Sequence, residues 1–160
     1  NGFQTLVKSG LLPGSKWRDD RAVTLTYNER RQFECRWVWL QPNPNSPCLF
    51  TRGLDEPLYV PIAHGEGRVV TKDQDTLDSL WLKGLVPLTY TDPSGMPGGY
   101  PWNPNGSQVD IAGLCNPNGN VFGLMPHPEN HVFPWQHPRR HRGESGNMGL
   151  RLFENGIRFA

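Results

Sequence analysis

The stretch Val109-Asp110-Ile111-Ala112-Gly113-Leu114-Cys115-Asn116-Pro117-Asn118-Gly119-Asn120-Val121-Phe122-Gly123-Leu124-Met125-Pro126-His127-Pro128-Glu129 decides how the fold is interpreted. Two apolar runs, 109–115 and 121–125, flank a polar segment that contains Asn118-Gly119. Asn-Gly between two such runs is the strongest short-range signal for a β-hairpin, since both residues tolerate the positive φ angles of a tight turn. The sequence therefore predicts two antiparallel strands here.

Weaker patterns lie around this hairpin. Helices are predicted where apolar residues have helical spacing: residues 3–11, the segment from Thr71 as N-cap to Gly84, and Met148–Phe159. Short strands are predicted at Val23–Tyr27, Gln32–Leu40, Cys48–Arg52, Leu58–Ala63 and Leu85–Thr91. The first two strands are expected to pair through Asn28–Arg31. Gln41–Pro47 and Asp92–Gly106 are rich in Pro, Asn or Gly and are predicted loops, the second a candidate for binding.

Composition limits the class of protein. A chain of 160 residues with 36% hydrophobic residues can bury one core, so a single domain is expected over residues 1–160. The net charge of +1 argues against a nucleic-acid surface, and the cluster Arg139–Arg142 is interpreted as a solvated loop. No apolar run is long enough for a membrane span, and the first residues lack the charged and apolar regions of a signal peptide, so a cytoplasmic location is predicted. Three cysteines do not form the pattern of a disulfide framework.

The candidate catalytic residues directly follow the hairpin. His127 and Glu129 stand two residues apart at the end of an apolar strand, and prolines on both sides restrict the backbone of His127. A neutral imidazole can take a proton from a thiol and return it to a leaving amine, while a carboxylate on its other nitrogen fixes the tautomer. Taken alone, His-Pro-Glu more often marks a loop histidine beside a surface glutamate. The surrounding segments favour the catalytic interpretation.

Ile111–Glu129 resembles the end of the glutaminase domain of phosphoribosylformylglycinamidine synthases, a family of class I glutamine amidotransferases. Phe33–Val38 and Pro61–Arg68 resemble two further blocks of that family, in the same order. Asn1–Gln4 is similar to the residues that follow the nucleophile in the family pattern Gly-x-Cys-Asn-Gly-x-Gln. The resemblance covers nearly the whole chain, although Asn130 replaces the arginine that usually follows Pro-Glu, and residues 136–145 match no block.

The resemblance implies an α/β fold: a flavodoxin-like class I glutamine amidotransferase domain, here without its N-terminal strands. It implies a Cys-His-Glu triad in which His127 is the base, Glu129 orients it, and the cysteine precedes Asn1. The N–H of Asn1 would then contribute to the oxyanion hole. Gln4 and the loop Ala63, His64, Gly65, Glu66 would hold the substrate glutamine. Because the helical pattern is already under way at the first residues and no initiator Met is present, we expect the sequence to lack upstream residues.

The implied partner is a formylglycinamidine ribonucleotide synthetase domain or subunit, to which ammonia passes for ATP-dependent amidation in purine biosynthesis. ATP and Mg are expected in that partner, and no cofactor is expected in this domain, which has no phosphate-binding Gly-rich motif. Cys35, Cys48 and Cys115 do not stand at a strand-to-helix turn and are interpreted as structural, so the chain as given is predicted to be inactive. An alternative is a non-catalytic amidotransferase-like domain that docks to a synthetase.

A metal site is a further alternative. His127 and His131, and His137 and His141, have the spacing that chelates a metal on one face of an α-helix. Prolines at 126, 128, 134 and 138 interrupt both pairs, which argues against a helix there. We therefore predict no metal in this domain.

Overall fold

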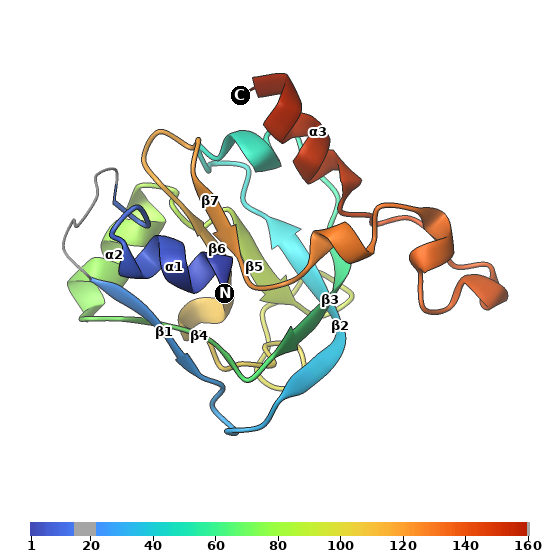
Figure 1. The fold of residues 1–160 in the computed structure, drawn as a ribbon, viewed down its shortest axis with the longest axis horizontal. Coiled ribbons are helices and arrows are strands. Elements are labelled where there is room, and N and C mark those ends of the chain that lie inside the picture. The colour runs from blue at the N-terminus through green and yellow to red at the C-terminus, as the bar shows by residue number, and fades with distance from the viewer. Residues whose placement is uncertain (15–21, 160) are drawn as a thin grey trace.

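The computed structural model describes residues 1–14 and 22–159 (Figure 1). These residues form three α-helices: α1 (Gly2–Lys8), α2 (Gln74–Leu82) and α3 (Leu150–Phe159). They form seven strands: β1 (Val23–Tyr27), β2 (Glu34–Pro42), β3 (Leu58–His64), β4 (Glu66–Thr71), β5 (Leu88–Thr91), β6 (Ile111–Cys115) and β7 (Phe122–Leu124). None of the helices in this part of the chain is long and apolar enough to cross a bilayer.

Five strands make the larger sheet, in the order β3-β2-β5-β6-β7, and every recorded pair in it is antiparallel. The long strand β2 is paired on both edges. It pairs with β3 from Glu34↔His64 to Leu40↔Leu58 and with β5 on its other edge. A separate two-stranded sheet pairs β1 with β4. Alternate residues of β2 and β3 are buried, as expected for strands with one face against a core.

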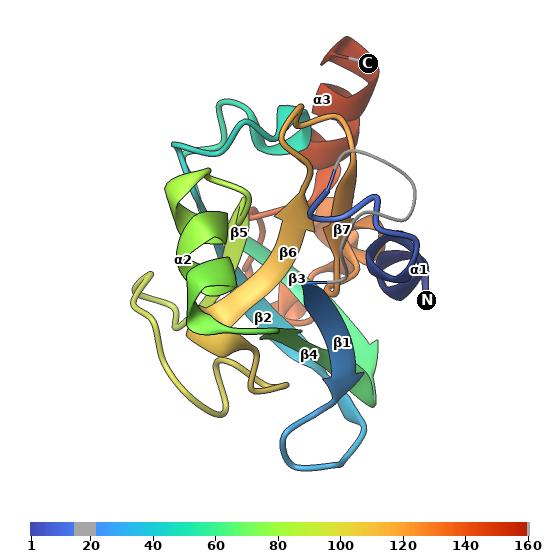
Figure 2. The same cartoon turned by 90° about the vertical axis from the view of Figure 1, so that its left-hand side faces the viewer.

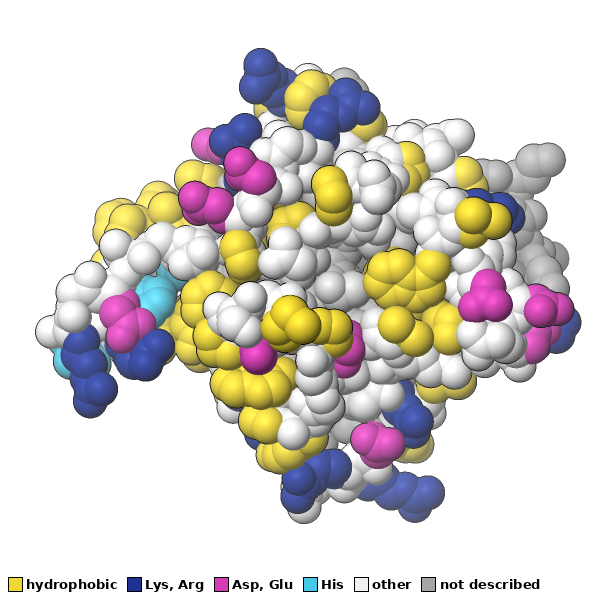
Figure 3. All heavy atoms as spheres, turned by 180° about the vertical axis from the view of Figure 1, so that it is seen from behind, with side chains coloured by type: hydrophobic (Ala, Val, Ile, Leu, Met, Phe, Trp, Pro, Cys, Tyr) yellow, Lys and Arg dark blue, Asp and Glu magenta, His cyan; other side chains and the backbone are white. Residues whose placement is uncertain are grey.

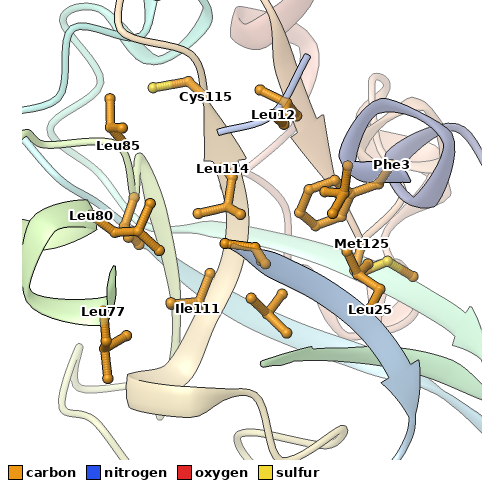
Figure 4. Close-up of a cluster of buried hydrophobic side chains, with 14 of the residues drawn as sticks. Phe3, Leu12, Leu25, Leu77, Leu80, Leu85, Ile111, Leu114, Cys115 and Met125 are labelled. Atoms are coloured by element: carbon orange, nitrogen blue, oxygen red, sulfur yellow. The ribbon is translucent and has the colours of Figure 1, made fainter. Parts of the chain in front are cut away.

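The hydrophobic core has two clusters that meet at β6, whose five residues are all buried. Ile111 and Leu114 belong to the cluster shared with α1, α2 and β1, which Figure 4 shows gathered around β6. Ala112 belongs to the cluster formed by β2, β3, β5 and α3. Figure 2 shows α1 and α2 flanking β6; both helices belong to the cluster of Ile111 and Leu114, whereas Leu152 of α3 belongs to the cluster of Ala112. Its continuous apolar run follows from burial on both faces.

The predicted hairpin is confirmed. Strands β6 and β7 pair antiparallel with the register Gly113↔Leu124 to Cys115↔Phe122, and Gly119 in the turn has a φ of 71°. The side chain of Asn116 closes the turn by accepting from the N–H of Val121 at 3.0 Å. A Cβ on Gly123 would lie 2.3 Å from a ring carbon of Phe3, so glycine is what allows α1 to pack directly on β7.

The predicted pairing of the first two strands is wrong, although both strands exist. β1 pairs with β4, which the sequence patterns did not identify, and β2 pairs with β3 and β5. The physical reason lies in the connection: the N–H of Asn28 donates to the carbonyl of Gly65 at 2.9 Å, and its side chain binds the same loop. The chain therefore leaves the small sheet at Asn28 and enters the larger one.

Four smaller expectations are also corrected. Cys48–Arg52 is not a strand; its residues Leu49–Thr51 form a 3-10 turn, because the Asn155 side chain on α3 donates to the carbonyls of Phe50 and Arg52. The N-cap of α2 is Asp73 rather than Thr71, since the Asp73 carboxylate accepts from the N–H of Thr76 at 2.8 Å. Strand β2 extends to Pro42, into the predicted loop. Cys35, interpreted as structural, is exposed on β2.

The surface carries no concentration of one charge on the face seen from behind in Figure 3. Lys and Arg side chains stand there in separate groups, with Asp and Glu side chains among them. This distribution agrees with the net charge of +1. The absence of a nucleic-acid partner remains a prediction.

Candidate active site

His127 and Glu129 form a hydrogen-bonded pair at the end of the hairpin. The Nδ1 of His127 lies 2.7 Å from Oε1 of Glu129, and both side chains are about half exposed. The backbone is held independently: the N–H of Met125 donates to Ala112 of β6 at 3.1 Å, and the N–H of His127 donates to Pro61 of β3 at 2.8 Å. A 3-10 turn at Pro128–Asn130 then brings the carboxylate back to the ring. The second ring nitrogen of His127, Nε2, is then the one that can exchange a proton with a bound reactant.

A cleft of about 520 Å³ opens beside His127. Four segments distant in sequence form its walls: the start of α1, Phe33 before β2, the loop region 63–66, and the end of β7 with the residues after it. In the region 63–66 only Gly65 lies outside strands β3 and β4. The lining residues are Asn1, Gly2, Phe3, Gln4, Phe33, Ala63, His64, Gly65, Glu66, Leu124, Met125 and His127. The structure thus brings together Asn1, predicted to contribute to the oxyanion hole, and the five residues predicted to hold glutamine. It places Glu129 outside this lining, behind His127.

The first helix and the loop 63–66 are directly bonded across the cleft. The side-chain N–H of Gln4 donates to the carbonyl of Glu66 at 2.9 Å. Helix α1 is fixed in turn by the packing of Phe3, which is buried against β7. The two walls therefore have a defined spacing, which a site for a small polar substrate requires.

His64 is a buried histidine in the cleft wall. It is 6% exposed, and its Nδ1 lies 3.1 Å from the side-chain oxygen of Asn28. Burial lowers the pKa of His64 to about 4, and the nearby His127 acts in the same direction. His64 is therefore neutral at pH 7. The sequence pattern does not distinguish Asn28, because a polar residue directly after a strand resembles any turn residue.

We predict that stability falls as the pH is lowered from 6.5 towards 4. The unfolded chain binds the proton of His64 near its ordinary pKa of 6.5, whereas the folded protein binds it only near 4, so the unfolded state holds more protons within that window. The full difference corresponds to roughly 3 kcal/mol. Urea unfolding of the wild type and of His64→Gln at a series of pH values measures it. Equal pH dependence in the two proteins would contradict the prediction.

Two of the three cysteines lie in the core, and the third, Cys35, lies opposite the cleft residue Ala63 in the β2–β3 register. Cys48 and Cys115 are buried in the core cluster around β6, and Cys35 is on the surface of β2. None of the three is among the residues that line the cleft. Within the described residues, no thiol therefore lines the cleft beside His127.

Two of the four histidines in the metal alternative, His131 and His137, pack into an aromatic cluster. His131 is fully buried; its Nδ1 lies 2.6 Å from the carbonyl of Tyr59 and its ring packs edge-on to Trp37. The ring centroids of His131 and His137 are 5.4 Å apart. In residues 1–14 and 22–159, no group of three or more potential ligands that could hold a metal ion is found. Both His-x-x-x-His pairs lie on 3-10 turns and loops, where the prolines interrupt the helix.

Comparison with known proteins shows the family to which the chain belongs. The profile of the CobB/CobQ-like glutamine amidotransferase domain matches residues 1–160. The chain belongs to this family. Relatives named phosphoribosylformylglycinamidine synthase subunit PurQ, from Treponema denticola and Dehalococcoides mccartyi, are each 44% identical to this chain. These matches cover 99% and 100% of this chain, and 64% and 61% of the relatives.

A solved structure supports the same fold. A chain in the structure of PurLQS from Thermotoga maritima is similar to this chain, with a TM-score of 0.66 and 32% sequence identity. The match covers 98% of this chain and 57% of the chain from Thermotoga maritima. The predicted fold class, an α/β glutamine amidotransferase fold, is therefore confirmed. The chain spans about three-fifths of the length of the curated relatives that it matches.

Proposed function

We propose that this chain is part of the glutaminase component of a phosphoribosylformylglycinamidine synthase. It would hydrolyse glutamine and supply ammonia for the ATP-dependent amidation of formylglycinamide ribonucleotide in purine biosynthesis. The observation that carries the proposal is the His127–Glu129 pair at 2.7 Å, standing at a cleft whose other walls are Gln4 and the loop 63–66. The names of the relatives support the choice of synthase.

In the proposed mechanism the nucleophile is a cysteine encoded immediately before Asn1. His127 takes the thiol proton at Nε2 while Glu129, bonded to Nδ1, stabilises the imidazolium. The thiolate attacks the side-chain amide carbon of glutamine, and the N–H of Asn1 donates to the oxyanion that forms. His127 then returns the proton to the leaving nitrogen, which departs as ammonia. Water hydrolyses the thioester, releasing glutamate and restoring the thiol.

The binding roles follow from the lining of the cleft. Gln4 and the loop Ala63, His64, Gly65 and Glu66 are proposed to hold the amino acid portion of glutamine. The chemistry on the ribonucleotide, with its ATP and Mg, would take place in a formylglycinamidine ribonucleotide synthetase domain or subunit, in the cytoplasm. The long segment 92–106, which has no helix or strand, is a candidate contact region for that partner.

The test is ammonia release from glutamine by the full-length protein, alone and with its synthetase. We expect hydrolysis, and we expect a diazoketone analogue of glutamine to label one cysteine, the residue before Asn1, as located by mass spectrometry. The 160-residue chain is expected to release no ammonia and to remain unlabelled at the cleft. A residue other than cysteine at that position, together with absence of hydrolysis, would favour a non-catalytic docking domain instead.

A further inference from the structure

A buried asparagine outside the predicted site holds the loop that forms one wall of the cleft. Asn28 is 1% exposed and follows β1 directly. Its Nδ2 group donates to two carbonyl oxygens, those of Gln32 at 2.9 Å and His64 at 2.8 Å. Its backbone N–H donates to the carbonyl of Gly65 at 2.9 Å. The bonds to His64 and Gly65 fix two consecutive residues of the cleft wall.

These contacts determine the orientation of the amide. Carbonyl oxygens only accept, so the end of the Asn28 side chain that faces Gln32 and His64 must be the NH2 group. The opposite end, Oδ1, accepts from the N–H of Gly67 at 3.1 Å and lies 3.1 Å from Nδ1 of His64. An amide oxygen can only accept, so it pairs with Nδ1 only if that nitrogen carries a proton. His64 is therefore protonated on Nδ1, which excludes the neutral Nε2–H tautomer.

Close packing keeps the ring in this position. A Cβ on Gly67 would lie 2.7 Å from Cε1 of His64 and 3.0 Å from Nε2, so the ring rests directly on the backbone of Gly67. The described part of the chain offers Nε2 no hydrogen-bond partner. A buried neutral nitrogen without a donor is tolerated far better than a buried unpaired charge. Burial and the missing partner at Nε2 thus both favour an uncharged ring, and with the proton on Nδ1 this ring is the Nδ1–H tautomer.

We infer that Asn28 is a positioning residue of the glutaminase site, holding His64 as a neutral Nδ1–H imidazole and fixing the loop 64–67 beside His127. This inference rests on the proposed function. The charged and titratable groups that act on His64 are Glu34, its partner in the β2–β3 register, and His127 in the same cleft. Glu34 is engaged by Arg36, whose Nε donates to it at 2.9 Å.

The neutral state of His64 matters because His127 must become an imidazolium during the reaction. A second cation in the same cleft would oppose that step, since like charges in a partly buried site disfavour each other's protonated form. Asn28 supplies a neutral acceptor where a carboxylate would promote a charged His64. The loop held by Asn28 also carries the carbonyl of Glu66 that Gln4 binds.

The test is Asn28→Asp in the full-length protein. The carboxylate cannot donate to the carbonyls of Gln32 and His64, and it favours protonation of His64. We expect kcat for glutamine hydrolysis to fall on the order of 10²-fold, as when a loop that positions the substrate is displaced by about 1 Å. We expect the acidic limb of the pH profile to move to higher pH by about one unit or more. An unchanged pH profile in a folded variant would overturn the inference.

Asn155→Asp is the matched control. Asn155 is also buried and its Nδ2 also donates to two carbonyls, those of Phe50 and Arg52, each at 2.9 Å. This variant loses the same kind of bonds on α3. We therefore expect a lower melting temperature and an unchanged pH profile of glutamine hydrolysis. An equal shift of the profile in the control would show a general effect of lost stability and overturn the inference.

Histidine NMR of the wild-type protein decides the tautomer without any activity or variant. We expect His64 to give the signals of a neutral Nδ1–H imidazole at pH 7; an Nε2–H tautomer or an imidazolium would overturn the inference. Failure of the wild type to hydrolyse glutamine would instead count against the proposed function, and the NMR spectrum would still decide how Asn28 holds His64.

Discussion

Replacing His127 with alanine is expected to lower kcat for glutamine hydrolysis by roughly 10²- to 10⁴-fold, the range for loss of a general acid–base group. The reason is geometric: Nδ1 of His127 is bonded to Glu129 at 2.7 Å, and the ring lines the cleft with its other nitrogen available. Ammonia release by the full-length protein measures the effect. Activity close to that of the wild type would remove His127 from the mechanism.

The substitution His127→Ala should lower the rate of hydrolysis without lowering the stability of the fold. The His127 side chain is about half exposed, and the backbone bond to Pro61 does not depend on the ring. Thermal unfolding of His127→Ala should therefore match that of the wild type within a few degrees, since surface substitutions cost little. His141→Ala is the control: this histidine is exposed on the 3-10 turn Arg140–Arg142, and its removal should leave hydrolysis unchanged.

The sequence predicts those parts of the fold whose signals are local. Asn118-Gly119 determines the β6–β7 turn, and the apolar runs beside it become the paired strands. The helix at the N-terminus and the one at the C-terminus are found where apolar residues have helical spacing. The partners of β1 and β2 could not be predicted in this way, since strand pairing depends on residues distant in the chain and local pattern does not encode it.

The candidate site shows the same division. His127 and Glu129 are neighbours in sequence, so a short motif suggests their contact. The cleft around them requires that α1, the loop 63–66 and β7 meet in space, and only a family resemblance predicted those residues. Asn28 was identified by neither route, because its importance lies in side-chain bonds to backbone atoms 36 and 39 positions later in the chain.

Gly119→Ala is expected to destabilise the protein by roughly 3–5 kcal/mol, combining a strained backbone with a steric clash. Gly119 has a φ of 71°, and a Cβ there would lie 2.0 Å from the carbonyl oxygen of Pro47 and 2.7 Å from its carbon. These are backbone atoms, which cannot rotate away as a side chain could. Relief would require the turn to move off Leu49, whose N–H donates to Gly119 at 2.9 Å. Urea unfolding measures the loss.

Gly143→Ala separates the two contributions. Gly143 has a similar φ of 79° but no atom lies within 4 Å of its added Cβ, so only the backbone strain of about 1–2 kcal/mol applies. Equal losses in the two variants would show that the turn does not press on Pro47. The end of the hairpin that carries His127 is held separately by the bonds of Met125 and His127 to Ala112 and Pro61. The folded fraction of Gly119→Ala should therefore keep its activity per molecule, so that stability and chemistry can be changed independently at the two ends of one hairpin.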